Sequence, residues 1–360
     1  MINCKPDNNK INSGYYIVDF DNAKDKEMKL YEVADSLKFT FLQYDKENPV
    51  GEILHYKVTE NYLFIVDQQQ KLFVFKKNGD LVTFIYNKGR GPSEYITIED
   101  FIVDSREESI FILSPTSGKL LKYDIYGNFI ESFSINYTHA AHISKLTNGN
   151  YCIYQSARFS ENNFNIFFLD KNFQVINSVI DSKGAFIKKI PYLLDVVWGN
   201  HNNSTYYKEV LSDTVFKINQ KNTSEPYILF DLGKKRMPDK YYEKTGYYQK
   251  NAHKFYQVGS ILESGKYFFL QIAYNNEKKY FLYKKNNNES LIINLGTKGF
   301  SNNIDIDFWP EYIDDSETMY RFIDPIELRS KLKETSEANE IKNILDSNDN
   351  PVLLSGKLLD

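Results

Sequence analysis

The sequence is poor in cysteine and tryptophan and has no long apolar run. Only two cysteines, Cys4 and Cys152, and two tryptophans occur among 360 residues. One cysteine lies in the N-terminal tail and the other in an apparent strand, so a disulfide framework is excluded as a source of stability. A transmembrane helix needs about eighteen consecutive apolar residues, and no such run is present. No secretory leader is visible either.

An excess of positive charge is also lacking. The net charge is −4 and the isoelectric point about 5.9, which excludes a global basic face for nucleic acid and gives an anionic membrane surface no attraction. The sequence has no G-x-S-x-G elbow, no H-E-x-x-H metal motif and no phosphate-binding loop that leads into a helix. It has no convincing Ser/His/Asp order. We therefore predict no catalytic residue and no cofactor from motifs.

Ring-bearing side chains, by contrast, are abundant. The chain contains 28 Tyr and 26 Phe, and its 42% hydrophobic and 26% charged residues are typical of a globular protein. Tyr and Phe favour the pleated, half-buried surfaces of strands. The composition therefore favours an all-β fold.

A repeat of about 45 residues runs through the chain, and each copy has the pattern strand, polar turn, strand, Gly/Asn turn, strand. The strands that open the copies begin at Tyr62, Ile110, Tyr151, Thr205 and Tyr267, with spacings of 48, 41, 54 and 62 residues. Loop insertions explain the drift in spacing. Four strands in such a period predict a β-propeller. Five copies and the C-terminal region make six blades.

The sixth copy contains a helical insertion at about residues 325–346. Asp324 suits the N-cap of a helix, and Pro325 and Glu327 suit its first turn. The insertion leaves the last blade one strand short, while residues 36–44 alternate apolar and polar side chains as a strand does. We predict that this N-terminal strand completes the last blade and closes the ring, which removes an exposed sheet edge.

Residues 15–360 are therefore expected to form a single propeller domain, preceded by a flexible tether at residues 1–14. Cys4 lies in this tether and is followed by the polar residues 5–10. A bacterial lipoprotein has this pattern directly after its lipidated cysteine, so Cys4 is a candidate for lipidation. The alternative is an ordinary cysteine in a polar tail.

One segment resembles a known family. Gly89, Gly91, Pro92, Glu94 and Tyr95 match the pattern G-x-G-P-x-E-Y. This pattern resembles the connection between blades in a six-bladed β-propeller family that is abundant in gut Bacteroidetes and related in architecture to NHL-repeat propellers. The resemblance implies extracytoplasmic lipoproteins with roles in nutrient binding. It brings no catalytic residues with it.

Propellers usually bind ligands where the connections between blades converge near the central axis. We call these connections crossings, and the side of the ring on which they lie the crossing face. The first crossing, residues 87–99, offers Arg90, Glu94 and Tyr95. They predict either a ligand-facing charge, carboxylate and ring, or a backbone staple in which Glu94 accepts N–H bonds and Tyr95 packs between blades.

Histidine and tryptophan supply further candidates for ligand binding. His139 and His142 fall in the second crossing, where their spacing puts the two rings on opposite faces of a strand but on the same side of a helical turn. No second cluster of ligands accompanies them, so no metal site is predicted. Trp198 and Trp309 stand at blade entries. Each predicts either a platform for sugar stacking or packing between blades.

The last crossing contains the alternating polar residues Asn303, Asp305 and Asp307. Their oxygens suit calcium, although the glycine and the closing glutamate of an EF-hand loop are missing. Hydrogen bonding to a sugar is the second interpretation, and a satisfied loop network is the third. The fourth crossing, residues 233–256, is long, aromatic and rich in lysine, which predicts a short helix packing over the crossing face.

These patterns together predict a monomeric cell-envelope protein, lipid-anchored and extracytoplasmic, that binds a small glycan, a peptide or an envelope protein on the crossing face. A hydrolase or lyase in the same cleft is one alternative, and a scaffold that binds through its rim is another. An enzyme would bring two carboxylates, or a carboxylate and a histidine, together with shifted pKa values. A scaffold would expose a broad apolar patch. The fold alone does not decide between them.

Overall fold

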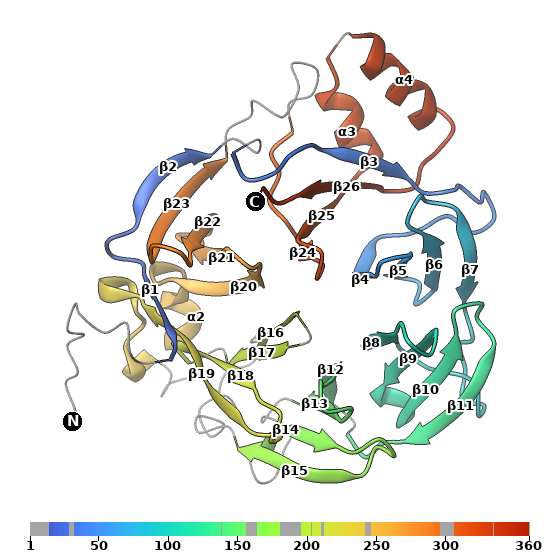
Figure 1. The fold of residues 1–360 in the computed structure, drawn as a ribbon, viewed down its shortest axis with the longest axis horizontal. Coiled ribbons are helices and arrows are strands. Elements are labelled where there is room, and N and C mark those ends of the chain that lie inside the picture. Colours follow the sequence, from blue (N-terminus) through green and yellow to red (C-terminus); the bar gives the residue numbers. More distant parts are fainter. Residues whose placement is uncertain are drawn as a thin grey trace.

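The computed structural model describes residues 14–28, 32–137, 139–155, 164–180, 196–202, 204–209, 212–241, 246–295, 306–333 and 335–359. Its strands form six sheets that are arranged in a ring around a common axis (Figure 1). The predicted all-β, six-bladed propeller is therefore confirmed. Among the described residues, no helix has the length and apolar character needed to span a membrane.

The blades follow one another along the chain, and in blades 1 to 5 four antiparallel strands run from the inner to the outer position. Blade 1 contains β4 (Ile53–Val58), β5 (Tyr62–Asp67), β6 (Leu72–Lys76) and β7 (Leu81–Ile85). Blade 2 contains β8 (Asp100–Asp104), β9 (Ser109–Ser114), the short 3-10 helix η2 (Pro115–Ser117), β10 (Lys119–Asp124) and β11 (Phe129–Ser134). Blade 3 contains β12 (Ala140–Lys145), β13 (Tyr151–Gln155), β14 (Phe164–Leu169) and β15 (Val175–Ile180).

The second half of the ring repeats this arrangement. Blade 4 contains β16 (Val196–His201), β17 (Ser204–Glu209), β18 (Thr214–Ile218) and β19 (Ser224–Asp231). Blade 5 contains β20 (Gln257–Glu263), β21 (Tyr267–Tyr274), β22 (Glu277–Lys284) and β23 (Glu289–Leu295). Blade 6 contains β24 (Tyr312–Ile313), β25 (Thr318–Ile323), β26 (Val352–Lys357) and β3 (Lys38–Phe41).

Apolar side chains on both faces of each sheet pack between neighbouring blades. On β5, every residue after Tyr62 is buried. Phe64 and Val66 of blade 1 share one buried cluster with Phe101 and Ile110 of blade 2. A blade can bury both of its faces only when neighbours flank it on both sides, so the stability of each blade depends on the closed ring.

The ring closes between the two ends of the chain, as predicted. β3 pairs antiparallel with β26, and Phe41 lies opposite Val352 while Lys38 lies opposite Ser355. The N-terminal strand is thus the outer strand of blade 6, whose other strands come from the end of the chain. β26 therefore has a partner on both sides instead of an open edge.

The N-terminal segment does more than close the ring. β1 (Tyr16–Asp19) adds to blade 4 by pairing in parallel with β19, and β2 (Lys24–Met28) adds to blade 5 by pairing in parallel with β23. The segment therefore runs along the outside of blades 4, 5 and 6 in turn (Figure 1). Parallel pairing requires only an open strand edge, and no local sequence pattern identifies the partner strand.

The insertion in blade 6 forms two helices rather than one. In α3 (Pro325–Lys331), the carboxylate of Asp324 accepts the N–H groups of Ile326 at 2.8 Å and Glu327 at 3.2 Å, so Asp324 is the N-cap that the sequence predicts. The backbone becomes extended at Leu332, and α4 (Ser336–Leu345) follows. Both helices lie outside the ring beside β3 and β26 (Figure 1).

The fourth crossing contains the short helix that the sequence predicts. After β19 the chain forms η4 (Gly233–Lys235), η5 (Asp239–Tyr241), α2 (Tyr247–Asn251) and η6 (Ala252–Lys254). It then enters β20, the inner strand of blade 5.

Candidate functional site

The first crossing is a backbone staple. Glu94 Oε2 accepts the N–H of Gly91 at 2.7 Å. A Cβ atom on Gly89 would lie 2.0 Å from the same oxygen, so a larger residue there would displace the Glu94 carboxylate. The Tyr95 ring is fully buried, and its hydroxyl donates to the carbonyl oxygen of Gln70 at 2.7 Å. The interpretation of Tyr95 as a ligand-facing ring is therefore wrong, because the ring packs between blades; Arg90 remains exposed.

In the last crossing Trp309 is a packing residue, which is the second of the two interpretations that the sequence left open. Trp309 is only 4% exposed, and its ring lies 4.8 Å from the ring of Tyr280 and 5.3 Å from that of Phe269. Trp309 therefore packs in the core and does not offer a surface for stacking. The carbonyl oxygen of Asp307 accepts from Arg321 at 2.7 Å, whereas Asp307 Oδ1 is buried and has no hydrogen-bond partner among the described residues.

Three of the predicted residues lie outside the described part of the chain. They are Cys4, Asn303 and Asp305. The calcium interpretation of the last crossing falls there as well. Among the described residues, no group of three or more His, Cys, Asp or Glu side chains is placed to hold a metal ion.

His142 and Trp198 come together, although the sequence placed them in separate crossings. Both lie in inner strands, β12 and β16, and their rings are parallel within 7° with centroids 5.7 Å apart. Trp198 Nε1 donates to Ser144 Oγ at 3.0 Å, and that hydroxyl donates to Asn200 Oδ1 at 2.9 Å. His139 lies before β12 and is exposed. The second crossing therefore contributes a strand histidine, not a pair of histidines.

Asp100 connects this aromatic pair to blades 1 and 2. It is the first residue of β8 and is buried. Its carboxylate lies 3.2 Å from Lys57 Nζ of β4 and 3.7 Å from His142 Nδ1, and it accepts the N–H of Ile143 at 3.0 Å. Burial acts to raise the pKa of Asp100, but Lys57, His142 and this N–H together hold the pKa well below its usual range. Asp100 is therefore a charged acceptor at neutral pH.

Two more titratable groups belong to the same region. Burial raises the pKa of Glu99, which directly precedes β8, and His142 acts in the opposite direction. Burial also lowers the pKa of His55 on β4, although Asp100 opposes the shift. His55 is therefore neutral at pH 7, and Glu99 binds its proton more tightly than an ordinary carboxylate does.

We call this group the inner-strand cluster. It comprises His55, Lys57, Glu99, Asp100, His142, Ser144, Trp198 and Asn200. The residues come from or directly precede the inner strands of blades 1 to 4, so the contacts link four successive blades around the axis. Because inner strands begin at the crossings, Glu99, Asp100, His142 and Trp198 lie toward the crossing face.

Sequence reasoning found only His142 and Trp198 of this cluster. Lys57, Asp100 and Asn200 occupy ordinary positions in strands, and no motif marks them. Polar residues inside otherwise apolar inner strands were the one available signal, since a buried charge normally has a partner. The partners lie about 40 to 60 positions away along the chain, at equivalent places in neighbouring repeats.

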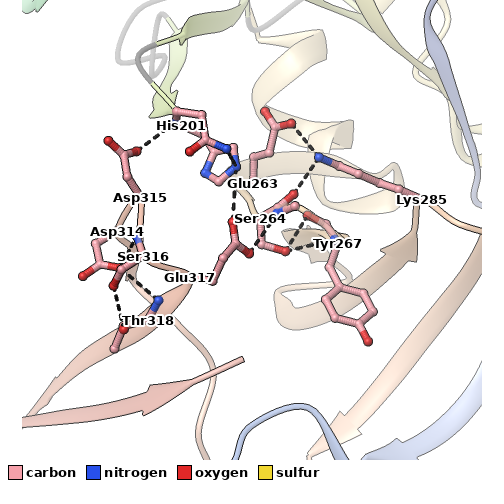
Figure 2. Close-up of polar contacts among 12 residues, drawn as sticks. His201, Glu263, Ser264, Tyr267, Lys285, Asp314, Asp315, Ser316, Glu317 and Thr318 are labelled. Carbon is pink, nitrogen blue, oxygen red and sulfur yellow. Dashed lines mark hydrogen bonds and ion pairs between the residues drawn. The ribbon is translucent and has the colours of Figure 1, made fainter. Parts of the chain in front are cut away.

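The opposite face of the ring is held together by turns. Figure 2 shows His201, at the end of β16, with its Nε2 atom 3.5 Å from Glu317 Oε1 of blade 6. Both carboxylate oxygens of Glu317 accept the N–H of Gly265 at 2.9 Å, and Asp315 accepts the N–H of Asn202 at 2.9 Å. The turn after β24 therefore contacts blades 4 and 5 together.

A buried ion pair lies beside these turns. Glu263 Oε1 is 2.6 Å from Lys285 Nζ, and the two side chains are 6% and 11% exposed (Figure 2). Tyr227 of blade 4 donates to the same oxygen at 2.5 Å. Burial lowers the pKa of Lys285, while Glu263 acts to raise it. On this face Glu263, Lys285, Glu317 and Asp315 are paired with other groups of the chain, whereas Asn200 of the inner-strand cluster is exposed.

Two solved structures with a similar fold come from Bacteroides species. A "Putative exported protein" from Bacteroides fragilis NCTC 9343 matches with a TM-score of 0.73 and 18% sequence identity, over 96% of this chain and 100% of that chain. A member of the duf4221 family from Bacteroides vulgatus ATCC 8482 matches with a TM-score of 0.54 and 11% identity, over 91% of this chain and 97% of that chain. At these identities the likeness shows the propeller fold.

Comparison at the level of sequence gives the family. No curated protein matches the chain. Because no comparison tests it, the resemblance to NHL-like lipoproteins stays a prediction. The family model described as "Domain of unknown function (DUF4934)" matches residues 15–357, which is nearly the whole chain. The chain therefore belongs to the DUF4934 family.

Proposed function

We propose that this protein binds a glycan at the inner-strand cluster, on the crossing face of the propeller. The observation that carries the proposal is the parallel pair of His142 and Trp198 beside the charged carboxylate of Asp100. A sugar offers an apolar C–H face to an aromatic ring and hydroxyl groups to hydrogen-bonding side chains. The cluster provides both kinds of partner in one place.

The polar groups of the cluster are suited to hydroxyl recognition. Lys57 donates hydrogen bonds. The buried Asp100 carboxylate, which is already paired with Lys57 and accepts the N–H of Ile143, holds Lys57 in place. The side chain of Asn200 is exposed, and its oxygen already accepts from Ser144 at 2.9 Å and Thr205 at 2.8 Å. Its amide nitrogen, which has no partner among the described residues, is therefore free to donate to a ligand.

We also place the protein in the cell envelope, outside the cytoplasm, with Cys4 as the site of a lipid anchor. The similar Bacteroides fragilis protein carries the description of an exported protein, which supports this location. The polar residues that follow Cys4 support the anchor. Metabolic labelling with a fatty-acid analogue should mark the wild-type protein and leave a Cys4→Ser variant unlabelled. Equal labelling of both would overturn the anchor.

The binding proposal is tested by thermal unfolding and calorimetric titration against a panel of oligosaccharides and peptides. A ligand present at about one hundred times its Kd should add roughly 2.7 kcal/mol to the stability of the fold. Trp198→Ala and His142→Ala should abolish that gain. Tyr126→Ala is the matched control, because Tyr126 is 59% exposed and lies in a turn on the opposite face. A gain that persists in both cluster variants would place the ligand elsewhere.

A hydrolase or lyase at the same site is the second candidate. The raised pKa of Glu99 favours it, because a carboxyl group that holds its proton more tightly is better suited to act as a general acid. Neutral His55 is in the same cluster. A bound oligosaccharide should then yield shorter products, and Glu99→Gln should stop their formation without abolishing binding. If the oligosaccharide is unchanged after prolonged incubation, the enzyme interpretation is refuted and only the binding role remains.

Binding through the rim is the remaining alternative. Apolar side chains are exposed on the outer strands of blades 2 and 3, namely Phe129 and Ile130 on β11 and Val175 and Ile176 on β15. In the described part of the chain, neither strand has a partner on its outer side, unlike β19 and β23. If no ligand in the panel raises the stability, these edges are the surfaces to probe for a protein partner.

A further inference from the structure

The fourth crossing has an excess of basic over acidic residues, although the chain as a whole has a negative net charge. Six basic residues stand against one acidic residue, Asp239, within residues 233–241 and 246–256: they are Lys234, Lys235, Arg236, Lys240, Lys250 and Lys254. Residues 242–245, between these ranges, add no net charge, because the negative charge of Glu243 offsets the positive charge of Lys244. The segment, which we call the basic loop, thus has a net charge of +5, and since the whole chain has −4, the rest has −9.

The basic loop is fixed to the propeller at several points. Arg236 Nε lies 2.5 Å from Asp213 Oδ2 of blade 4. The carbonyl oxygen of His253 accepts the N–H of Asn275 in blade 5 at 2.6 Å, and the Tyr248 hydroxyl donates to Gln257 Oε1 at 3.1 Å. The described parts of the loop, residues 233–241 and 246–256, therefore present their charges from a defined position.

Four of its lysines, Lys234, Lys240, Lys250 and Lys254, are exposed. Aromatic rings lie among these lysines. Tyr247 is 51% exposed, and Tyr241 lies with its ring centroid 6.3 Å from that of Tyr247 and 5.6 Å from that of Phe255. Lys240 Nζ is 5.4 Å from the centroid of the Tyr241 ring. The surface thus combines cations for carboxylate or sulfate groups with rings on which sugars stack.

The basic loop is connected to the inner-strand cluster through β20. It leads directly into Gln257, the first residue of β20, and β20 lies next to β16, which carries Trp198. Both features are on the crossing face, because a crossing and the start of an inner strand share that face. A chain of several sugars that occupies the cluster would reach the loop by passing the start of β20.

We propose that the basic loop makes this site select an acidic oligosaccharide, one with carboxylate or sulfate groups, over a neutral one. The inference rests on the proposed glycan-binding function and names the class of glycan. A nucleic acid duplex or an anionic bilayer is a large, densely charged surface that would also meet the remainder of the molecule, with its net charge of −9. A short acidic chain contacts the loop alone.

The experiment is calorimetric titration of the full-length protein with three oligosaccharides of equal length. One is carboxylated (an oligogalacturonate), one is sulfated, and one is neutral, and each is measured at two salt concentrations. The acidic probes should bind about tenfold more tightly than the neutral probe at low salt, and the difference should shrink as salt rises. Lys250→Glu/Lys254→Glu should remove the preference and leave neutral binding unchanged. Lys171→Glu/Lys221→Glu is the control, because both lysines are exposed in turns on the opposite face.

Other outcomes separate this inference from the function on which it rests. Equal affinity for acidic and neutral probes in the wild type overturns the selection but keeps the glycan site. In another outcome, the loop variant loses binding of the acidic probes while Trp198→Ala retains it. That result supports binding by the basic loop and overturns binding by the inner-strand cluster. Preferential capture by anionic vesicles, with no affinity for any oligosaccharide, overturns both in favour of a membrane surface.

Discussion

The buried pair of Glu263 and Lys285 allows a sharp test of how blades 4 and 5 are joined. Glu263 Oε1 receives hydrogen bonds from Lys285 at 2.6 Å and from Tyr227 at 2.5 Å. Lys285 also donates to the carbonyl oxygen of Ser264 at 2.6 Å and lies 4.3 Å from the ring centroid of Phe268. The substitution Lys285→Met keeps most of the aliphatic stem but removes the charge, which leaves the Glu263 carboxylate buried without a counter-ion.

The expected loss follows from that geometry. Breaking a buried ion pair by removing one partner destabilises a protein by about 3 to 5 kcal/mol, because the remaining charge has lost its solvation. Tyr227 alone does not neutralise a carboxylate that is 6% exposed. The double variant Glu263→Gln/Lys285→Met should be about 2 kcal/mol more stable than Lys285→Met, since no uncompensated charge remains.

The assay is urea-induced unfolding at pH 7, followed by far-UV circular dichroism. Lys284→Met is the matched control, because Lys284 pairs with Glu289 at 3.0 Å while both side chains are about a quarter exposed. Such a pair contributes less than about 1 kcal/mol. The reasoning is refuted if Lys285→Met costs no more than Lys284→Met, or if the double variant is less stable than Lys285→Met.

Three further predictions follow from the described contacts. Deleting residues 1–44 removes β3 and leaves β26 with an open edge, so the melting temperature should fall; an unchanged transition would show that ring closure does not need this strand. Gly89→Ala should cost about 1 to 3 kcal/mol in chemical unfolding, because the new methyl group overlaps the Glu94 carboxylate, and Glu94→Ala should relieve most of the loss. The Asp100 carboxyl has a lowered pKa in the folded state, so its contribution to stability is present above about pH 4 and is lost as the pH falls below that value. Asp100→Asn should therefore be less stable than the wild type at pH 7, with a gap that narrows toward pH 3; a constant gap would contradict the assignment.

The sequence was most informative about the fold, because the patterns that indicate a propeller are set by residues close together in the chain. Alternating apolar strands, Gly/Asn turns and a recurring length are properties of neighbouring residues, so the period survives loop insertions. The N-cap at Asp324 and the missing strand of blade 6 were also predictable, because a capping residue and an unpaired edge each demand a partner. The pairing of β1 and β2 with blades 4 and 5 was not, since a parallel edge contact has no signature in either strand.

The candidate site was predicted only in part. Trp198 and His142 were identified by residue type, yet nothing in the sequence placed their rings together. For Trp309 and Tyr95 the sequence left open either a ligand-facing ring or packing between blades, and both rings are buried. The neighbouring sequence is the same for an aromatic residue that faces a ligand and for one that is buried between blades. The two cases are distinguished only by whether the strands of the folded blades cover the ring.

The sequence by itself determined the all-β class, the number of blades and the strand that closes the ring, because these depend on periodicity and on unsatisfied edges. The tertiary structure decided which polar side chains meet. Lys57, Asp100 and His142 come from three separate blades and become neighbours only when the blades stand side by side around one axis. Curvature of the ring, rather than distance along the chain, sets which inner-strand residues come within hydrogen-bonding distance. For this reason the charge of Asp100 and the stacked rings beside it are properties of the assembled propeller and of no single repeat.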